Sequence, residues 1–399
     1  MKIYEIGTGY TPIPAQRGAA TEIVVEELAK AFLKLGQDVQ VVDIAAENRA
    51  PTDLPIRQVP VPRCFRRTDV KLGLMHKLKR VVYSMSLGAV LGKMLRKEKE
   101  PVVLHFHNQY NLFFFLLLTG RRLRQKAFVA YTNHSGVWRQ NWSDIENIIR
   151  RRYFQEAYCM CRADLVFLLN SETRENVVRH LGVPEDKTVL IGNGVNTDVY
   201  HPLAPSEIQT AKKAWGLSGY KMILQVGSIN ENKGQLRTAE GLLPLLKKHP
   251  DLVFACAGAV VEESCGNRLM ALAREQDMTR QIRYLGEVAP GKALNELYNA
   301  AEATILPSRF ESFGLAAVES MAAGVPVLLE EKSLVTFSDG VVWFGEGYLA
   351  HTAEQLLYAE PDDYENLCAR ARTYAQEQYS WKKIADEYLL AFRNGMKQE

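Results

Sequence analysis

The segment Thr304-Ile-Leu-Pro-Ser-Arg-Phe-Glu311-Ser-Phe-Gly314-Leu-Ala-Ala-Val-Glu319 joins a short apolar run, a polar loop and a stretch of small apolar residues. Residues 304–306 are typical of a buried strand, and the stretch after Gly314 is typical of a helix packed against a sheet. A strand that passes directly into a helix is the repeating unit of parallel α/β sheets. The segment therefore predicts an α/β fold.

The same alternation of short apolar runs and helical stretches continues in both directions. The predicted strands are residues 2–6, 39–44, 102–106, 128–132, 165–169 and 189–191, and then residues 222–226, 253–257, 282–285, 304–306 and 325–328. Each set is large enough for one doubly wound parallel sheet with helices on both faces. At 399 residues the chain is also too long for one ordinary core. We predict two facing, doubly wound, Rossmann-like domains.

The boundary between the two predicted domains falls in residues 192–202. This segment is rich in turn-forming residues and ends in Pro202, a composition typical of a hinge. We therefore predict an N-terminal domain of residues 1–195 and a C-terminal domain of residues 196–380. Residues 381–399, which begin at Trp381, are expected to form a final helix.

The composition excludes several classes of protein. With 47% hydrophobic and 24% charged residues the chain is typical of a folded protein, and its net charge of +3 is too small to indicate a nucleic-acid partner. Six cysteines lack the spacing of zinc or redox sites, which predicts reduced thiols in the cytoplasm. The first residues read as a strand and not as a signal peptide, and no apolar run approaches the roughly 20 residues of a membrane span.

Two acids stand out in the opening segment. Glu311 follows the strand directly, and ligands of open parallel sheets bind beyond the carboxyl ends of the strands. Glu319 lies in an otherwise apolar helix, where a carboxylate needs a partner such as a ribose diol. The backbone N–H groups of Phe313, Gly314 and Leu315 begin that helix and would favour a phosphate. The alternative is that both acids are ordinary surface charges.

The wider pattern resembles the donor-site signature of the retaining glycosyltransferases of family 4, which have the two-domain GT-B fold. That signature is Pro-Ser, an acid, seven residues, a second acid and Met-Ala-x-Gly-x-Pro-Val, and this chain has Pro307-Ser308, both acids and Met321-Ala-Ala-Gly-Val-Pro-Val327. The resemblance implies that Glu311 contacts hydroxyls of the donor sugar, that Glu319 holds the ribose and that Ser308 lies in the donor site. It also implies that the final helix packs back on the N-terminal domain, which serves the acceptor.

A second segment, Val226-Gly-Ser228-Ile-Asn-Glu-Asn-Lys233-Gly234, leads from a strand into a helix. A lysine there can neutralise a diphosphate, or it can be an ordinary exposed lysine. The family carries Gly-Arg-x-x-x-x-Lys-Gly at this place, and both cations bind the leaving pyrophosphate. Lys233 matches, whereas Ser228 replaces the arginine. The loss of one charge-assisted hydrogen bond costs ~1.5–3 kcal/mol, roughly one to two decades in rate, unless another basic residue substitutes.

Five further positions come from the resemblance or from the strand pattern. Tyr284 matches the position whose backbone reads the nucleotide base, although Tyr-Leu-Gly is also an ordinary strand end. Gly18 matches a glycine-rich turn near the donor phosphates, and His134 matches a histidine that the family places against the donor sugar; a lone histidine is otherwise more often structural. His105 and His107 share one face of a strand, as metal ligands can, but no carboxylate or cysteine nearby is expected to complete a site. We expect no metal and no cofactor.

Residues 57–99 are strongly basic. They include two acids, Asp69 and Glu98, against Arg57, Arg63, Arg66, Arg67, Lys71, Lys77, Lys79, Arg80, Lys93, Arg96, Lys97 and Lys99. Apolar residues alternate with these charges, and a run of phenylalanines and leucines follows at residues 112–118. The pattern predicts either peripheral contact with an anionic membrane at its inner face or a core helix with a solvated side. A phosphate-rich acceptor is a third interpretation.

The sequence as a whole favours a retaining hexosyltransferase. Its donor would be a nucleoside-diphosphate sugar, with UDP favoured, and its acceptor a glycan, a lipid-linked sugar or a small molecule. The expected catalytic residues are Glu311, Lys233 and His134. Residues 12–18 resemble bacterial enzymes of spore-coat or envelope polysaccharide assembly. Two alternatives stay open, namely a pseudoenzyme that serves as a membrane-surface scaffold and a GT-B epimerase or phosphorylase.

Overall fold

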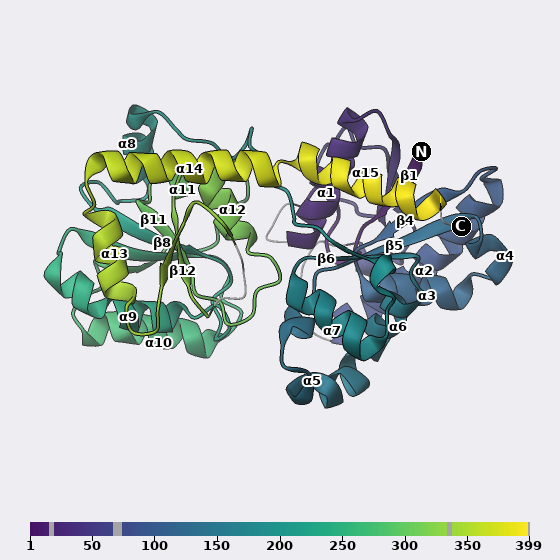
Figure 1. Cartoon of the computed structure of the whole chain (residues 1–399), viewed down its shortest axis with the longest axis horizontal. Helices are drawn as coiled ribbons and strands as arrows, with labels where there is room; N and C mark the ends of the chain where they lie inside the picture. Colours follow the sequence, from purple (N-terminus) through teal and green to yellow (C-terminus); the bar gives the residue numbers. More distant parts are fainter. Residues whose placement is uncertain (16–19, 67–73, 333–336, 398–399) are drawn as a thin grey trace. The chain divides into compact units, whose positions relative to one another are not determined.

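The computed structural model describes residues 1–15, 20–66, 74–332 and 337–397, and the chain divides into two compact units (Figure 1). The first comprises Met1–Gly194 and Trp381–Glu399, and the second comprises Val195–Ser380. Each unit is built on one parallel sheet, of seven strands in the first and six in the second. The predicted α/β class with two doubly wound sheets is confirmed. None of the helices in the described ranges is long and apolar enough to cross a membrane.

The first sheet has the strand order β3-β2-β1-β4-β5-β6-β7, and all of its neighbours pair in parallel. Its strands are β1 (Lys2–Ile6), β2 (Asp38–Ile44), β3 (Ile56–Val59), β4 (Val102–Phe106), β5 (Ala127–Asn133), β6 (Leu165–Leu168) and β7 (Thr188–Leu190). The helices are α1 (Ala20–Lys34), α2 (Leu74–Lys97), α3 (Gln109–Leu118), α4 (Arg121–Arg124), α5 (Trp142–Ile148), α6 (Phe154–Arg162), α7 (Ser171–Leu181) and α15 (Trp381–Lys397). A short π-helix, Ile149–Tyr153, joins α5 to α6.

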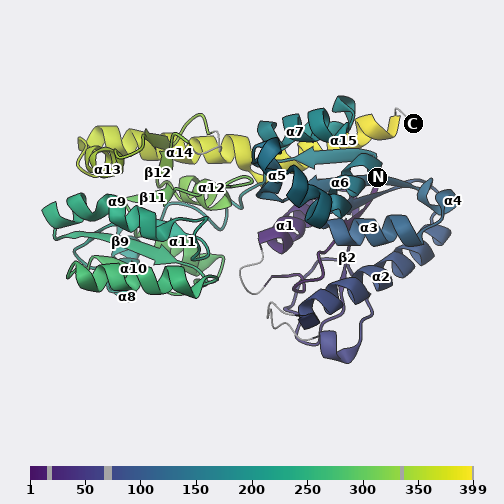
Figure 2. The same cartoon turned by 90° about the horizontal axis from the view of Figure 1, so that it is seen from below.

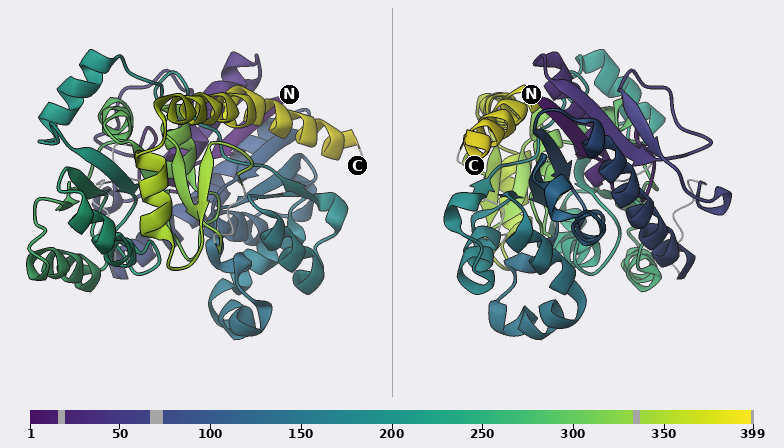
Figure 3. Two further views of the ribbon diagram at one scale, coloured as in Figure 1. Left: turned by 60° about the vertical axis from the view of Figure 1, so that its left-hand side comes forward. Right: turned by 90° about the vertical axis from the view of Figure 1, so that its right-hand side faces the viewer.

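Side chains of these strands alternate between two separate cores, because successive residues of a strand point to opposite faces. Ile3 and Val103 pack with α1 and α15, whereas Tyr4 and Leu104 pack with α2, α3 and α6. Each face of the sheet is thus covered by helices (Figure 3). Because helices cover both faces of the sheet, its strands are continuous apolar runs and do not alternate apolar with polar residues.

The second sheet has the order β10-β9-β8-β11-β12-β13 and is also entirely parallel. Its strands are β8 (Lys221–Val226), β9 (Leu252–Ala257), β10 (Ile282–Tyr284), β11 (Ala303–Leu306), β12 (Val327–Glu330) and β13 (Val341–Phe344). The helices are α8 (Pro205–Ala214), α9 (Gln235–Lys248), α10 (Glu263–Glu275), α11 (Lys292–Asn299), α12 (Leu315–Ala322), α13 (Leu349–Leu357) and α14 (Pro361–Tyr379).

The sequence missed two strands, β3 and β13, and both lie at the edge of a sheet. In β3, Arg57 and Gln58 are exposed, and in β13 Trp343 is 39% exposed. An edge strand pairs on one side only and is less buried, so its residues lack the continuous apolar run that marks a central strand. The strand predicted at residues 325–328 is observed as β12, which begins two residues later, at Val327.

Strand order reverses direction between β1 and β4 in the first sheet and between β8 and β11 in the second. At such a switch point the helices that follow the two strands leave on opposite faces, so the carboxyl ends of the strands are open to a ligand. The loops after these four strands are therefore the places where this fold binds small molecules.

Helix α15 closes the core of the first unit. Its Phe392 is fully buried, with ring-centroid distances of 6.2 Å to Phe32 of α1 and 5.6 Å to Phe167 of β6. Tyr388, one turn earlier, lies 4.3 Å from the Phe167 ring. The last segment of the chain thus joins the core of the unit formed by residues 1–194.

We expect Phe392→Ala to lower the free energy of unfolding of the first unit by about 3–5 kcal/mol, because it leaves a cavity between α15 and the sheet. Calorimetric melting gives the measurement. Leu390→Ala is the matched control, since Leu390 lies on the same helix and is 59% exposed; its effect should stay within about 0.5 kcal/mol. Equal melting shifts for the two variants would contradict the packing described here.

Candidate active site

The loops after β8 and β11 bring Lys233 and Glu311 into contact at the switch point of the second sheet. The Nζ atom of Lys233 forms a salt bridge with Oε2 of Glu311. The two side chains retain 24% and 14% of their exposure, so the pair lies in a partly solvated position. Two residues that the sequence analysis singled out separately, 78 positions apart, are therefore direct neighbours.

Hydrogen bonds from neutral side chains hold both loops. Gln225, buried at the end of β8, donates from Nε2 to the carbonyl oxygen of Lys233 at 2.7 Å, and Asn230 Oδ1 accepts from the Lys233 N–H at 2.9 Å. Asn232 bonds both backbone groups of Phe310 at 2.9 Å. The loop of Lys233 is thus tied directly to the loop of Glu311. These amides were missed by sequence reasoning, although Gln225 in an apolar strand was a signal.

Gly314 lies between Glu311 and helix α12. Its φ of 93° falls in the left-handed region, which a residue with a Cβ rarely adopts, and it forms the N-cap of α12. The first backbone bonds of the helix run from the N–H groups of Ala317 and Val318 to the Gly314 oxygen, at 3.0 and 3.3 Å. The N–H group of Leu315 therefore precedes the first intrahelical bonds, as expected at a helix N-terminus.

The other predicted donor-site residues of this unit differ in their surroundings. Phe313 is buried, with its ring 5.4 Å from that of Tyr379, so it can offer a ligand only its backbone. Ser308 is buried, and its hydroxyl has no hydrogen-bond partner among the described residues. The Ser228 hydroxyl accepts from Asn230 Nδ2 at 2.9 Å. Tyr284 ends β10 and donates its hydroxyl to the Gly258 oxygen at 2.9 Å.

Glu319 faces a buried tyrosine on the neighbouring helix. The hydroxyl of Tyr298, on α11, donates to Oε2 of Glu319 at 2.9 Å, and Tyr298 is completely buried. Burial raises the pKa of Glu319 to about 7, against the hydrogen bonds from Tyr298 and Tyr200. The tyrosine partner was missed by the sequence analysis, because nothing in the sequence pairs α11 with α12.

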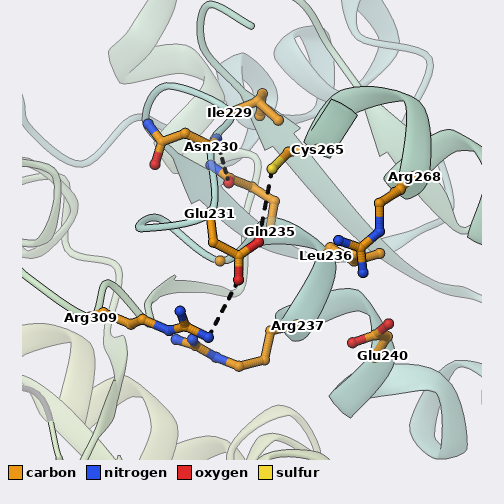
Figure 4. Close-up of a pocket in the computed structure, with 11 residues that line it drawn as sticks. Ile229, Asn230, Glu231, Gln235, Leu236, Arg237, Glu240, Cys265, Arg268 and Arg309 are labelled. Atoms are coloured by element: carbon orange, nitrogen blue, oxygen red, sulfur yellow. Dashed lines mark hydrogen bonds and ion pairs between the residues drawn. The ribbon is translucent and has the colours of Figure 1, made fainter. Parts of the chain in front are cut away.

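A cavity of about 170 Å³ lies beside the loop of Lys233, between α9 and α10 (Figure 4). Its charged lining is mixed: Glu231 lies 3.4 Å from Arg309 and is also close to Cys265, while Arg237, Arg268 and Glu240 complete the wall. The cavity is smaller than the roughly 300–1,000 Å³ of most ligand pockets. None of the residues predicted to bind the donor lines it.

His134 lies in the first unit, after β5, and belongs to a cluster at the other switch point. Its Nε2 atom is 3.0 Å from Nδ1 of His107, and Nε2 of His107 is 2.9 Å from Oε2 of Glu5. The second oxygen of Glu5 is 2.8 Å from Nδ1 of His105. His134 is partly exposed, whereas Glu5, His105 and His107 are buried. Gly18, the other site residue predicted in this unit, lies outside the described residues.

A carboxylate does lie beside His105 and His107, so the expectation that none is near them was wrong. Glu5 of β1 stands opposite His105 in the parallel register, so the sheet supplies a carboxylate from 100 residues away. The ligand atoms of these three residues lie within 4.8 Å of one another, as a metal site requires. In the structure, however, the carboxylate bonds both imidazoles directly, which satisfies all three groups without a cation. The absence of a metal cofactor stays a prediction.

Solved structures share the fold over the whole chain. Sucrose-phosphate synthase from Thermosynechococcus elongatus has a TM-score of 0.76 at 20% identity, with all of both chains covered. HepE of Anabaena, in complex with UDP and glucose, has a TM-score of 0.72 at 15% identity and covers 99% of this chain and 100% of its own. With its two parallel sheets, the chain therefore has the GT-B fold.

Two family models match successive parts of the chain. "Glycosyltransferase Family 4" matches residues 21–199, and "Glycosyl transferases group 1" matches residues 207–378. The D-inositol 3-phosphate glycosyltransferase of Corynebacterium aurimucosum is 28% identical over 240 residues, which cover 56% of this chain and 55% of that protein. The aligned part thus spans about half the length of this relative. The chain belongs to glycosyltransferase family 4.

We expect the stability of the protein to fall as Glu319 ionises. Because the folded-state pKa is raised from 4.5 to about 7, the protonated carboxyl stabilises the fold below pH 4.5. This contribution is lost as the pH rises through 7, and it amounts to at most about 3 kcal/mol. The glutamine of the Glu319→Gln variant cannot ionise. The melting temperature of this variant, relative to that of the parent protein, should therefore rise as the pH increases from 5 to 8.5. Parallel curves for the two proteins would show that the carboxyl is not desolvated.

Proposed function

We propose that this protein is a retaining hexosyltransferase that moves a sugar from a nucleoside-diphosphate donor, with UDP favoured, to a glycan, lipid-linked or small-molecule acceptor. The Lys233–Glu311 salt bridge carries this proposal. In a nucleotide sugar the anomeric carbon is bonded directly to a phosphate oxygen. A carboxylate in contact with an ammonium group matches that junction, since the carboxylate accepts from sugar hydroxyls and the ammonium group neutralises the adjacent phosphate.

Each group then has a role in a front-face substitution. The acceptor hydroxyl attacks the anomeric carbon, the bond to the phosphate oxygen breaks, and that oxygen takes the hydroxyl proton, so no protein base is needed. Lys233 and the amides at the start of α12 stabilise the charge that grows on the diphosphate. Glu311 and His134 orient the sugar. Glu319 accepts from the ribose diol in its ionised form.

Lys233 is the cation that we assign to the diphosphate, despite the serine at position 228. Two other basic residues lie at these loops, but both are engaged elsewhere. Arg237 donates to the Pro307 oxygen and lies 3.6 Å from Glu330, and Arg309 pairs with Glu231. The resemblance to envelope and spore-coat enzymes stays a prediction.

We expect Lys233→Ala to lower the rate of transfer by roughly 10–100-fold, the effect of one charge-assisted hydrogen bond. UDP and UDP-sugars should raise the melting temperature of the parent protein by mass action and raise that of the variant less. Lys247→Ala is the matched control, because Lys247 is exposed at the opposite end of α9 and should leave both measurements unchanged.

The alternative of a catalytically inactive scaffold makes the opposite prediction. In that case calorimetry would detect no binding of UDP at millimolar concentration, and Lys233→Ala would behave as the parent protein does. An epimerase or phosphorylase would instead convert the sugar without extending an acceptor, which product analysis separates.

We further propose that α2 and α3, which lie side by side (Figure 2), rest on an anionic membrane at the cytoplasmic face. Met85, Leu117 and Leu118 are 47%, 66% and 49% exposed, and Leu118 of α3 lies close to Gly88 of α2, three residues after Met85. Exposed basic residues lie further along α2 and in α4, namely Lys93, Lys97, Arg121 and Arg122. Exposed apolar and basic side chains on neighbouring helices suit the headgroup region of such a membrane.

Two of the basic residues that the sequence assigned to this surface have partners elsewhere. Lys79 is buried and donates to the Tyr10 oxygen at 3.1 Å, and Arg80 stacks 3.8 Å above the Tyr110 ring. Arg67 and Lys71 lie outside the described residues. The basic surface is therefore narrower than residues 57–99 suggested.

We expect the protein to sediment with vesicles that contain phosphatidylglycerol and to remain in solution with phosphatidylcholine vesicles. The double substitution Met85→Glu and Leu118→Glu should abolish sedimentation, because it removes apolar area and adds negative charge. Leu390→Glu, on the exposed side of α15, should not. Equal binding by all three proteins would exclude this surface.

A further inference from the structure

A buried hydrogen-bonded chain leads from the core of the first unit to the ring of His134. It runs from Tyr388 of α15 to Thr132 (3.1 Å), to His105 (2.7 Å) and to Glu5 (2.8 Å). From the other oxygen of Glu5 it continues to His107 (2.9 Å) and ends at His134 (3.0 Å). Every member before His134 is 4% exposed or less. Buried polar groups that are all bonded to one another have few ways to distribute their protons.

The proton positions follow from Glu5. Its carboxylate only accepts, so Nδ1 of His105 and Nε2 of His107 must both carry protons that point to it. On the other side of the His105 ring, Nε2 contacts the Thr132 hydroxyl, which in turn contacts the Tyr388 hydroxyl. A hydroxyl can donate or accept, so these contacts are satisfied whichever way the hydroxyl protons point. The arrangement accounts for a fully buried carboxylate in the middle of a parallel strand.

The same hydrogen-bond argument determines which ring nitrogen of His134 carries the proton. With its proton on Nε2, His107 has a lone pair on Nδ1, and the atom that faces this lone pair is Nε2 of His134. Two lone pairs cannot bond each other, so the proton between them belongs to His134. We infer that Glu5 and His107 hold His134 as the neutral Nε2–H tautomer, which leaves its Nδ1 atom as an obligatory hydrogen-bond acceptor for a bound ligand.

The charges of the groups around His107 agree with this assignment. Its neighbours are Glu5 on β1, His105 on the same strand and His134 after β5, while Tyr388 of α15 faces His105. Despite burial, the two histidines lower the pKa of Glu5 to about 2, so it is ionised. Burial and His105 lower the pKa of His107 to about 4, and burial also lowers the pKa of His134. His107 and His134 are therefore neutral at pH 7.

An Nδ1 atom of His134 that can only accept a hydrogen bond discriminates between ligands that can donate one and ligands that cannot. It bonds a neutral sugar hydroxyl, which can donate, and it opposes a carboxylate, which offers only lone pairs. This specificity rests on the proposed function, in which His134 contacts the donor sugar. The structure then favours a hexose with a free hydroxyl at the contacted carbon over the corresponding uronic acid. Glu5 and His107 act through His134 and are positioning residues.

Nitrogen-15 NMR of histidine-labelled protein tests the proton positions without any assumption about activity. The two ring nitrogens have different shifts when protonated and unprotonated, and single His→Gln variants assign the signals. We expect a proton on Nδ1 of His105 and the Nε2–H tautomer for His107 and His134, with no titration of His134 between pH 5.5 and 8. A proton on Nδ1 of His134 or of His107, or a cationic His134 in this range, would overturn the inference.

Two variants of His107 test the link to His134. His107→Phe removes the acceptor, so His134 should populate both tautomers, and the KM of a hexose donor should rise about tenfold, the effect of one misoriented hydrogen bond. His107→Asn keeps an oxygen near the former Nδ1 and should restore most of the tautomer preference and of the KM. If His107→Phe left the His134 tautomer unchanged, the inference would fail.

Failure of the proposed function can be distinguished from failure of the tautomer assignment. Should no nucleotide sugar serve as donor, the proposed function fails while the NMR measurement still decides the tautomers. If transfer is active, the parent protein is expected to prefer a UDP-hexose to the corresponding UDP-uronic acid by about tenfold or more in kcat/KM, and His107→Phe to narrow that preference. An unchanged preference in His107→Phe with a changed tautomer would remove the role in specificity.

Discussion

Parallel pairing of neighbouring strands is the constraint on which the rest of this structure depends. All strands of one sheet end at the same edge, so residues that follow different strands meet there whatever their separation in sequence. In the second sheet this brings Lys233, after β8, against Glu311, after β11. In the first it brings Glu5 of β1 against His105 of β4. Both pairs lie at the strands where the winding direction changes.

The two units use this edge in different ways. In the second unit the charges are partly solvated, and neutral amides such as Gln225 and Asn232 hold the loops that carry them. Ligand exchange requires such accessibility. In the first unit the carboxylate is fully buried and is satisfied by two imidazoles. A buried, ionised carboxylate such as Glu5 is tolerated only because each of its oxygens accepts a hydrogen bond. The protons of the neighbouring imidazoles are therefore held in fixed positions, whereas the charges of the second unit remain accessible to solvent.

Much of the fold could be predicted because parallel sheets covered on both faces need uninterrupted apolar strands. The central strands, such as residues 2–6 and 102–106, are therefore visible in the sequence, whereas β3 and β13 are not, since an edge strand carries polar residues. Lys233, Glu311 and Glu319 could be proposed as site residues because a charge that follows a strand or interrupts an apolar helix contrasts with its neighbours, and because they match the family's motifs. Tyr298 and Glu5 were missed as partners, because their contacts cross between elements.

The sequence by itself determined the α/β class, the two sheets and the residue types at the strand ends, since these depend on local apolar periodicity and on spacing along the chain. Only the tertiary structure decided which of those residues touch: that Lys233 pairs with Glu311, that Lys79 points inward, and that a carboxylate lies between His105 and His107. Such contacts depend on strand order and register, which the local pattern does not encode. The pKa values and the proton positions follow from these contacts and from burial, so they too belong to the folded protein.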